Sequence, residues 1–247
     1  MTGVMLVTGA SRGIGAAVAV AGARAGYAVA VHYGTHGEEA NAICDQIARG
    51  GGVAVAFQGD MGVEADIVQL FKSVDDSLGS ITALVNNAGG IIAVKPIADI
   101  DAATVNRILA VNLAGPIYCC REAVKRMSTA SGGAGGAIVN ISSMAALLGG
   151  LPNEVHYAAT KGGVDSLTVG LAREVATQGI RVNAIRPGVI DTPIHALHGE
   201  NFVDRMSSNL PMLRAGTAKE VAEAAIWLLS PAASYVTGSI LNVSGGR

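Results

Sequence analysis

The feature of this sequence that most constrains its fold is a regular alternation of short apolar runs with longer amphipathic segments. This alternation is typical of repeated βα units built around a parallel sheet. The expected strands are residues 4–7, 28–32, 53–58, 83–86, 137–141, 181–185 and 240–243. The expected helices are residues 14–25, 38–49, 64–78, 102–127, 155–178 and 219–229. We therefore predict an α/β fold with a doubly wound, seven-stranded parallel sheet and helices on both faces.

Composition places further limits on the class of protein. The chain has 247 residues, of which 50% are hydrophobic and 15% charged, so residues 1–247 are expected to form a single domain with a large core. The formal net charge is −2 and there is no long basic run. We therefore expect no nucleic-acid partner and no anionic membrane surface as a partner.

The cysteines and the apolar segments bear on location. Cys44, Cys119 and Cys120 lack metal-ligand spacing, and adjacent cysteines rarely bridge each other, so disulfides are not expected. The start, MTGVMLVTGASR, lacks the pattern of a secretion signal. The uncharged stretch 127–153 contains glycines and polar residues that bilayer hydrocarbon would penalise. A reducing cytoplasm is the expected location.

A glycine-rich loop, TGASRGIG, follows the first expected strand. Gly9, Gly13 and Gly15 stand at the junction of that strand with the next helix, with Ser11 and Ile14 between them. Residues without side chains let the backbone approach a pyrophosphate, and a helix N-terminus offers N–H groups to it. The spacing GxxxGxG differs from the commoner GxGxxG, and a purely structural glycine turn is the alternative. The position of the loop at the first βα junction favours dinucleotide binding.

The end of the second expected strand indicates which nucleotide is preferred. NAD-binding folds usually place a carboxylate there for the ribose hydroxyls, whereas this chain has His32-Tyr33-Gly34-Thr35. Without a carboxylate nothing repels a 2′-phosphate, and Arg12 can donate a charge-assisted hydrogen bond to it. His32 and Thr35 would add secondary contacts, and a solvated Arg12 is the alternative. The sequence therefore favours NADP, with NAD possible.

Polar residues also follow the third and fourth expected strands. Asp60, with Met61 after it, and the run NNAG at 86–89 stand where open α/β sheets bind ligands. Asp60 can accept a hydrogen bond from an adenine amino group. Ordinary turn chemistry is the alternative for both, because Asp, Asn and Gly all favour turns.

Tyr157 and Lys161 form a YxxxK pair within HYAATKGG, and Ser143 ends the apolar run AIVNIS. Residues four apart share one face of a helix, so the Lys161 charge is expected to lower the pKa of Tyr157. Tyr157 is therefore a candidate proton donor and acceptor.

Together these motifs resemble the short-chain dehydrogenase/reductase family in its single-domain form. The matches run in order from TGASRGIG through NNAG, AVNLAG, NISS and the Tyr–Lys pair to the proline and glycine at 187–188 and NVSGG. The resemblance implies a Rossmann-type fold. It also implies four catalytic residues, namely Asn112, Ser143, Tyr157 and Lys161. The nucleotide contacts that we expect are Gly9, Ser11, Arg12, Gly13, Ile14, Gly15, His32, Tyr33, Asp60, Met61, Asn86, Asn87, Ala88, Gly89, Tyr157, Lys161, Pro187, Gly188, Ile190 and Thr192.

The roles of the catalytic residues follow from their chemistry. In reduction, the Ser143 hydroxyl would donate to the substrate carbonyl while Tyr157 delivers its proton as hydride arrives from the nicotinamide. By resemblance, Lys161 would also hold the ribose hydroxyls, and Asn112 would anchor a proton-relaying water. Ser142 competes with Ser143 for the role of the serine. The family's serine usually stands one position nearer the tyrosine than Ser143, where this chain has Met144. The NISS context favours Ser143, with one residue inserted in the loop LLGGLPNEVH that is expected to wall the substrate pocket.

Several histidines need no special role. His195, His198 and Glu200 could be drawn as metal ligands, but no second cluster accompanies them, and we predict no metal. His156 adjoins Tyr157 but points elsewhere on a helix, which favours a structural or pocket-lining position. Residues 194–212 have the character of a mobile cover that determines the substrate.

The sequence thus predicts an NADP-dependent oxidoreductase that interconverts a carbonyl and a secondary alcohol on a small or medium-sized molecule. The alternatives are an NAD-dependent sugar or polyol dehydrogenase, a reductase of 3-oxoacyl groups on acyl carrier protein, and a catalytically silent nucleotide sensor. Gln178, where carrier-protein reductases often have arginine, argues against the second alternative. By resemblance, the helices at 102–127 and 155–178 would pack across a dimer interface in a homotetramer.

Overall fold

A computed structural model describes residues 3–199 and 201–247 of the chain. The strands are β1 (Gly3–Val7), β2 (Tyr27–Tyr33), β3 (Ala54–Gln58), β4 (Ile81–Asn86), β5 (Gly136–Ile141), β6 (Ile180–Pro187) and β7 (Ile240–Val243). All pair in parallel, in the order β3-β2-β1-β4-β5-β6-β7. The predicted seven-stranded parallel sheet of the Rossmann type is confirmed.

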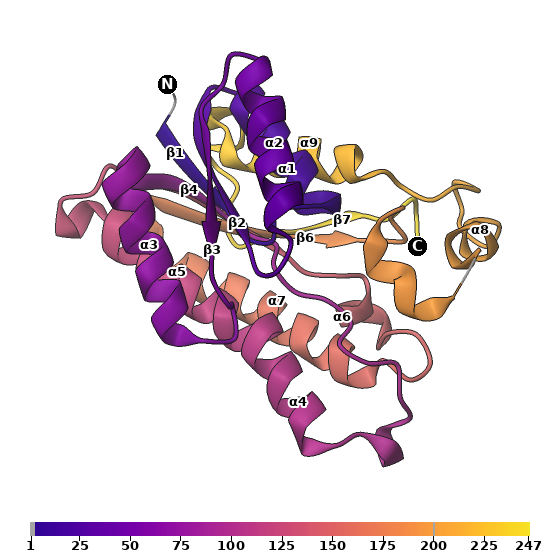
Figure 1. Cartoon of the computed structure of the whole chain (residues 1–247). Coiled ribbons are helices and arrows are strands. Elements are labelled where there is room, and N and C mark those ends of the chain that lie inside the picture. The colour runs from indigo at the N-terminus through magenta and orange to yellow at the C-terminus, as the bar shows by residue number, and fades with distance from the viewer. Residues whose placement is uncertain (1–2, 200) are drawn as a thin grey trace.

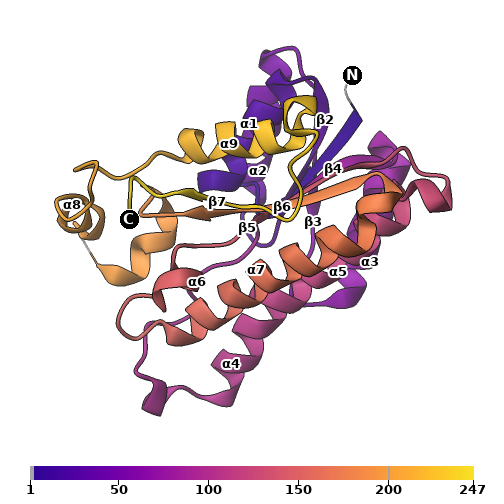
Figure 2. The ribbon, with the colours of Figure 1, turned by 180° about the vertical axis from the view of Figure 1, so that it is seen from behind.

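Helices cover both faces of this sheet (Figures 1 and 2). They are α1 (Gly13–Arg24), α2 (Gly37–Arg49), α3 (Glu64–Leu78), α4 (Ala102–Leu109), α5 (Gly115–Met127), α6 (Ala145–Leu148), α7 (Val155–Val175), α8 (Phe202–Ser207) and α9 (Ala218–Leu229). A π-helical turn, η2 (Ala110–Ala114), joins α4 to α5. The short 3-10 helices are η1 (Ile97–Asp99), η3 (Thr129–Ser131), η4 (Ala176–Gln178), η5 (Pro193–His198) and η6 (Pro231–Ala233).

The alternation of side chains along each strand builds one core on each face of the sheet. Met5 and Val7 of β1 join the core under α1, α2 and α9. Leu6, between them, joins the core against α3, α5 and α7, which contains the fully buried Phe71. Because a strand points successive side chains to opposite faces, continuous apolar runs are what a sheet covered on both sides requires.

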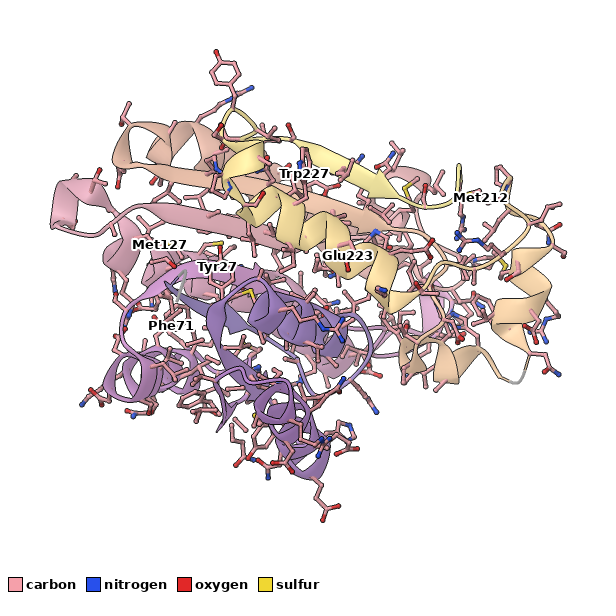
Figure 3. All side chains as sticks on the ribbon, turned by 90° about the horizontal axis from the view of Figure 1, so that it is seen from above. Tyr27, Phe71, Met127, Met212, Glu223 and Trp227 are labelled. Carbon is pink, nitrogen blue, oxygen red and sulfur yellow. The ribbon has the colours of Figure 1, made fainter. Side chains whose placement is uncertain are left out.

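The outer surfaces of the helices carry polar and scattered apolar side chains. Figure 3 shows Glu223 and Trp227 one turn apart on α9, and both are exposed. Trp227 is 42% exposed. Single exposed apolar side chains of this kind are ordinary on a protein surface. No helix in the described part of the chain is long and apolar enough to cross a membrane.

The secondary structure predicted from the sequence differs from the structure at η2, α6 and α8. The segment 102–127 was expected to be one helix, but the turn η2 divides it at Asn112. Single π-turns inside helices are frequently found at functional sites. The short helices α6 and α8 were not predicted. Both lie beyond the carboxyl ends of the strands, at one end of the molecule (Figures 1 and 2).

Candidate active site

A cavity of about 1000 Å³ opens at the carboxyl ends of the strands. It spans the point where the strand order reverses between β1 and β4, which is where open α/β sheets bind nucleotides. The predicted site residues that line it are Gly9, Ser11, Arg12, Gly13, Ile14, His32, Asp60, Met61, Asn87, Ala88, Gly89, Ser143, Tyr157, Lys161, Pro187, Gly188, Ile190 and Thr192. Gly15, Tyr33, Asn86 and Asn112 are not among its lining residues.

The glycine loop has the shape of a cradle for a pyrophosphate. Gly9 has φ +63°, and a Cβ there would stand 2.9 Å from the Cα of Ala88. Gly13, where α1 begins, has φ +58°. Gly15 does not face the cavity, because a Cβ at Gly15 would stand 2.2 Å from the Gly9 carbonyl oxygen. Its role is the close approach of helix to loop, which leaves the first N–H groups of α1 directed at the cradle.

Hydrogen bonds connect the carboxyl ends of β1 and β4 beside this loop. The Thr8 hydroxyl oxygen accepts from the N–H groups of Asn87 and Ala88, at 3.0 and 2.9 Å. The Asn87 side chain donates to the carbonyls of Thr8 and Gly9, both at 2.9 Å. Asn86, in contrast, is buried, and its side chain donates to Asn140 behind the cavity at 2.9 Å. The part played by Thr8 was missed, since one threonine in a loop carries no signal in the sequence.

His32 differs from its expected role as a secondary phosphate contact. Its ring is 2% exposed. Its Nδ1 accepts from the Gly9 N–H at 3.0 Å, and Nε2 donates to the Gly59 carbonyl at 3.0 Å in the tautomer that satisfies both bonds. Burial lowers the pKa of His32 to about 4, against smaller opposing effects from Gly59 and Asp60. His32 is therefore a neutral brace between the glycine loop and the end of β3.

Two other expected nucleotide contacts have partners within the protein. Asp60 lines the cavity, but its carboxylate accepts from Arg107 at 2.9 Å and from the Gly62 N–H at 2.8 Å. The Arg107 hydrogen bond is the main cause that lowers the pKa of Asp60. Tyr33 lies against the start of α2, where a Cβ on Gly37 would stand 3.1 Å from the tyrosine ring. Arg107 also lines the cavity, and sequence reasoning did not single it out.

Asn112 lies behind the cavity wall at the π-turn and is fully buried. Its carboxamide donates to the Gly90 carbonyl at 2.9 Å and accepts from the Gly90 N–H at 3.0 Å. A weaker bond of 3.4 Å runs to the Thr160 hydroxyl. Asn112 thus fixes the loop after β4 next to α7.

The candidate catalytic residues meet at the start of α7 and the end of β5. Tyr157 and Lys161 lie one turn apart on α7, and the Lys161 Nζ stands 5.8 Å from the centroid of the Tyr157 ring. Lys161 Nζ donates to the Ile141 carbonyl at 2.8 Å. The Ser142 hydroxyl donates to the Lys161 carbonyl at 3.2 Å, whereas Ser143 lines the cavity with Tyr157 and lowers the pKa of its phenol. This arrangement favours Ser143 over Ser142.

The proton affinities of this pair depend mainly on burial. Burial raises the pKa of Tyr157 to about 12, the Ser143 hydrogen bond lowers it, and the Glu154 charge raises it further. Burial also lowers the pKa of Lys161 to about 8, while Asp165 raises it. We expected Lys161 to lower the pKa of Tyr157, but the protein's own groups raise it, mainly through burial. The phenol stays protonated at neutral pH, which suits a proton donor.

The far end of the cavity is walled by α6, η5 and α8. His195 and His198 were expected to be ordinary loop residues, yet both line the cavity, with ring centroids 5.7 Å apart. His198 contacts the Glu154 carboxylate, and both side chains are almost fully buried. His156 is buried outside the cavity, with Nε2 3.0 Å from the Ala93 carbonyl oxygen.

Neither a metal centre nor a disulfide emerges from the described residues. Among residues 3–199 and 201–247, no group of three His, Cys, Asp or Glu side chains is arranged to hold a metal ion. Glu200, the third member of the set considered above, lies outside the described residues. Cys44, Cys119 and Cys120 are free thiols.

The fold and this cavity define a class of nucleotide-dependent oxidoreductases, in which a tyrosine beside a lysine shares a pocket with a glycine loop. Comparison with known proteins supports the assignment to this class. Residues 9–247 match the family model described as enoyl-(acyl carrier protein) reductase. The chain is 49% identical over 245 residues to the uncharacterized oxidoreductase YgfF of Escherichia coli K12, with 99% of each chain covered.

Two further relatives cover nearly the whole chain. The 3-oxoacyl-[acyl-carrier-protein] reductase FabG of Staphylococcus aureus Mu50 is 35% identical over 246 residues, covering 100% of this chain and 98% of FabG. A dehydrogenase/reductase from Sinorhizobium meliloti 1021 superposes with a TM-score of 0.91 at 33% identity, covering 99% of this chain and 94% of the other. The chain belongs to the short-chain dehydrogenase/reductase family. It is an oxidoreductase of CH–OH groups that uses a nicotinamide nucleotide.

Proposed function

We propose that this protein is an NADP-dependent reductase that interconverts a carbonyl and a secondary alcohol on a small or medium-sized molecule. The observation that carries the proposal is that Tyr157, Ser143 and Lys161 line the same cavity as the glycine loop. The glycine loop, with positive φ at Gly9 and Gly13, fits a dinucleotide pyrophosphate. When bound, the nicotinamide supplies the hydride in reduction and accepts it in oxidation.

The chain's own residues manage the proton and the developing negative charge. In reduction, Ser143 donates a hydrogen bond to the substrate carbonyl oxygen, and Tyr157 transfers its phenolic proton to that oxygen. The products are the secondary alcohol and the oxidised nucleotide, and a proton from solvent restores the phenol. The buried Lys161 ammonium, held by the Ile141 carbonyl, stabilises the transient phenolate.

The preference for NADP over NAD rests on the loop after β2. No carboxylate follows Tyr33 there, and the cavity beside it is lined by Thr35, His36 and Arg12. Arg12 is exposed and makes no side-chain cap hydrogen bond to α1, so its guanidinium can reach a 2′-phosphate.

Substitution of Arg12 tests this preference directly. We expect Arg12→Ala to weaken NADP binding by about tenfold or more, and to leave NAD binding nearly unchanged, because a charge-assisted hydrogen bond contributes about 1.5–3 kcal/mol. Isothermal titration with each nucleotide measures both affinities. Arg24→Ala, at the opposite end of α1, is the matched control. Equal losses for the two nucleotides would mean that Arg12 does not recognise the phosphate.

A second candidate function is reduction of 3-oxoacyl groups on acyl carrier protein, which the 35% identity to FabG favours. A carrier protein needs a basic surface beside the site. At the position where such reductases often carry arginine, Gln178 instead accepts a hydrogen bond from the Ser128 hydroxyl at 2.7 Å. Free small molecules therefore remain our first proposal.

We also propose a cytoplasmic homotetramer of one-domain subunits. Leu109, Ile117 and Val155, on α4, α5 and α7, are each between 42% and 48% exposed, and they offer apolar surface for contact between subunits. Light scattering of the purified protein measures the assembly.

Turnover is the test of the proposed function. The purified protein is mixed with NADPH or NADH and a panel of ketones and aldehydes, and loss of the reduced nucleotide is followed by absorbance. We expect turnover of free carbonyl compounds, faster with NADPH. Turnover of acyl-carrier substrates alone would favour the second candidate, and nucleotide binding without any turnover would indicate a sensor.

A further inference from the structure

Glu154 is a buried acid at the substrate end of the cavity. Glu154 directly precedes α7 and is 2% exposed. It lines the same cavity as Tyr157. Glu154 is the N-cap residue of α7 and stands three positions before Tyr157, so both belong to the start of that helix. Its charge raises the pKa of Tyr157.

The usual structural reason for an acid at this place does not apply. Acids before a helix commonly cap its first N–H groups, but Glu154 makes no side-chain cap hydrogen bond to α7. Within the described part of the chain, the carboxylate has one hydrogen-bonding partner, Nε2 of His198 on η5, which contacts Oε1. A buried carboxylate needs several hydrogen bonds, and a single protein partner leaves it able to accept another.

His198 is itself held in place by its surroundings. Its ring stacks on Phe202 of α8, with centroids 4.2 Å apart and planes 20° apart. Its Nδ1 is buried and has no partner among the described residues. The pair is thus a fixed polar group with open hydrogen-bonding capacity.

The rest of this end of the cavity is largely apolar. Its walls include Met144, Leu148, Leu151, Ile194 and Leu197. In such surroundings a single carboxylate discriminates strongly between substrates. A substrate that leaves the carboxylate unpaired binds weakly, whereas one that donates a hydrogen bond to it binds more tightly.

We propose that Glu154, held by His198, is the specificity-determining residue of this site, and that its carboxylate accepts a hydrogen bond from a hydroxyl group of the substrate. The inference rests on the proposed function and gives its substrate class, which is hydroxylated carbonyl compounds and the corresponding diols. A plain ketone leaves the carboxylate unpaired, and a ketone bearing an anionic group is repelled by it.

The presence of a carboxylate at this buried position supports a role in substrate recognition. A buried carboxylate carries a desolvation penalty, which its partners must offset. Among the described residues, the Glu154 carboxylate has one hydrogen-bonding partner and lines the cavity, so it is a candidate for binding the substrate.

The test compares three ring ketones of similar size with the NADPH-loaded protein: cyclohexanone, hydroxycyclohexanone and oxocyclohexanecarboxylate. We expect kcat/KM for the hydroxylated ketone to exceed that for cyclohexanone by about tenfold to a hundredfold, the worth of one hydrogen bond to a charged group. Glu154→Leu should remove this preference, mainly through KM. Glu154→Gln, which keeps the shape but not the charge, should also relieve the rejection of the anionic ketone.

Glu122→Gln is the matched control, because Glu122 is 4% exposed and ion-paired on α5 outside the cavity. We expect it to leave the ratios of kcat/KM unchanged. A merely structural Glu154 would lower kcat/KM for all three ketones alike in both variants, and that result would overturn the proposal. Preference for the anionic ketone would overturn it too and would point to Arg247, which also lines the cavity. Turnover of none of the ketones would count against the proposed function itself.

Discussion

Replacement of His32 by asparagine is expected to remove an acid-sensitive part of the stability of this protein. In the folded protein, His32 accepts from the Gly9 N–H and faces the Gly59 carbonyl, an arrangement that the neutral ring satisfies. Protonation would place a second N–H against the Gly9 N–H and a charge in a buried site. Asparagine can accept from Gly9 in the same way but does not titrate.

The size of the effect follows from the pKa of His32, which burial lowers from 6.5 to about 4. Above pH 6.5 the ring is neutral in both the folded and the unfolded chain, so His32 adds no pH dependence there. Between 6.5 and about 4 the unfolded chain binds a proton that the folded chain does not, so stability falls as the pH falls. At about 1.4 kcal/mol per pKa unit, the full loss is about 3 kcal/mol.

Urea denaturation at fixed protein concentration, repeated from about pH 7 down to about pH 4.5, measures this loss. We expect the wild type to lose about 2–3 kcal/mol more than His32→Asn over that range. His36→Asn, a part-exposed histidine beside the same loop, is the control and should keep the wild-type slope. Equal slopes for the wild type and His32→Asn would refute the account of His32 as a neutral brace.

Two further substitutions test the packing of the loop and of the core. Gly15→Ala places a Cβ within 2.2 Å of the Gly9 carbonyl oxygen. We expect the free energy of unfolding to fall by about 1–3 kcal/mol and NADP binding to weaken in nucleotide titrations. Unchanged binding would contradict the proposal that the glycine loop binds the pyrophosphate. Phe71→Ala leaves a cavity at a fully buried site between α3 and the sheet. We expect the free energy of unfolding, measured by urea denaturation, to fall by about 3–5 kcal/mol. A fall below about 1 kcal/mol would show that the surrounding core closes over the cavity.

The fold was predictable because its signals are local and repeated. Continuous apolar runs such as 4–7 are required by a sheet covered on both faces, and the structure places Val4 to Val7 in the two cores accordingly. The π-turn at 110–114 has no such signal. Within it, the Asn112 side chain hydrogen-bonds the backbone of Gly90, 22 residues earlier in the chain, a contact that leaves no local sequence pattern.

The site was predictable where a residue type is demanded by geometry, as at Gly9 and Gly13. It was not predictable where the role depends on a neighbour far along the chain. His32 was expected to contact phosphate. Only the fold shows that its two ring nitrogens hydrogen-bond the Gly9 N–H and the Gly59 carbonyl. Glu154 and His198 stand 44 residues apart, so no spacing in the sequence joins them.

The central claim is that the Tyr157 phenol donates the proton in carbonyl reduction, and the turnover of Tyr157→Phe tests it most directly. We expect kcat to fall by about 100-fold to 10,000-fold while NADP affinity measured by titration stays unchanged, because the ring remains and the proton is lost. Tyr118→Phe, which removes a hydroxyl on α5 outside the cavity, should keep full activity. A Tyr157→Phe enzyme that turns over at the wild-type rate would contradict the account.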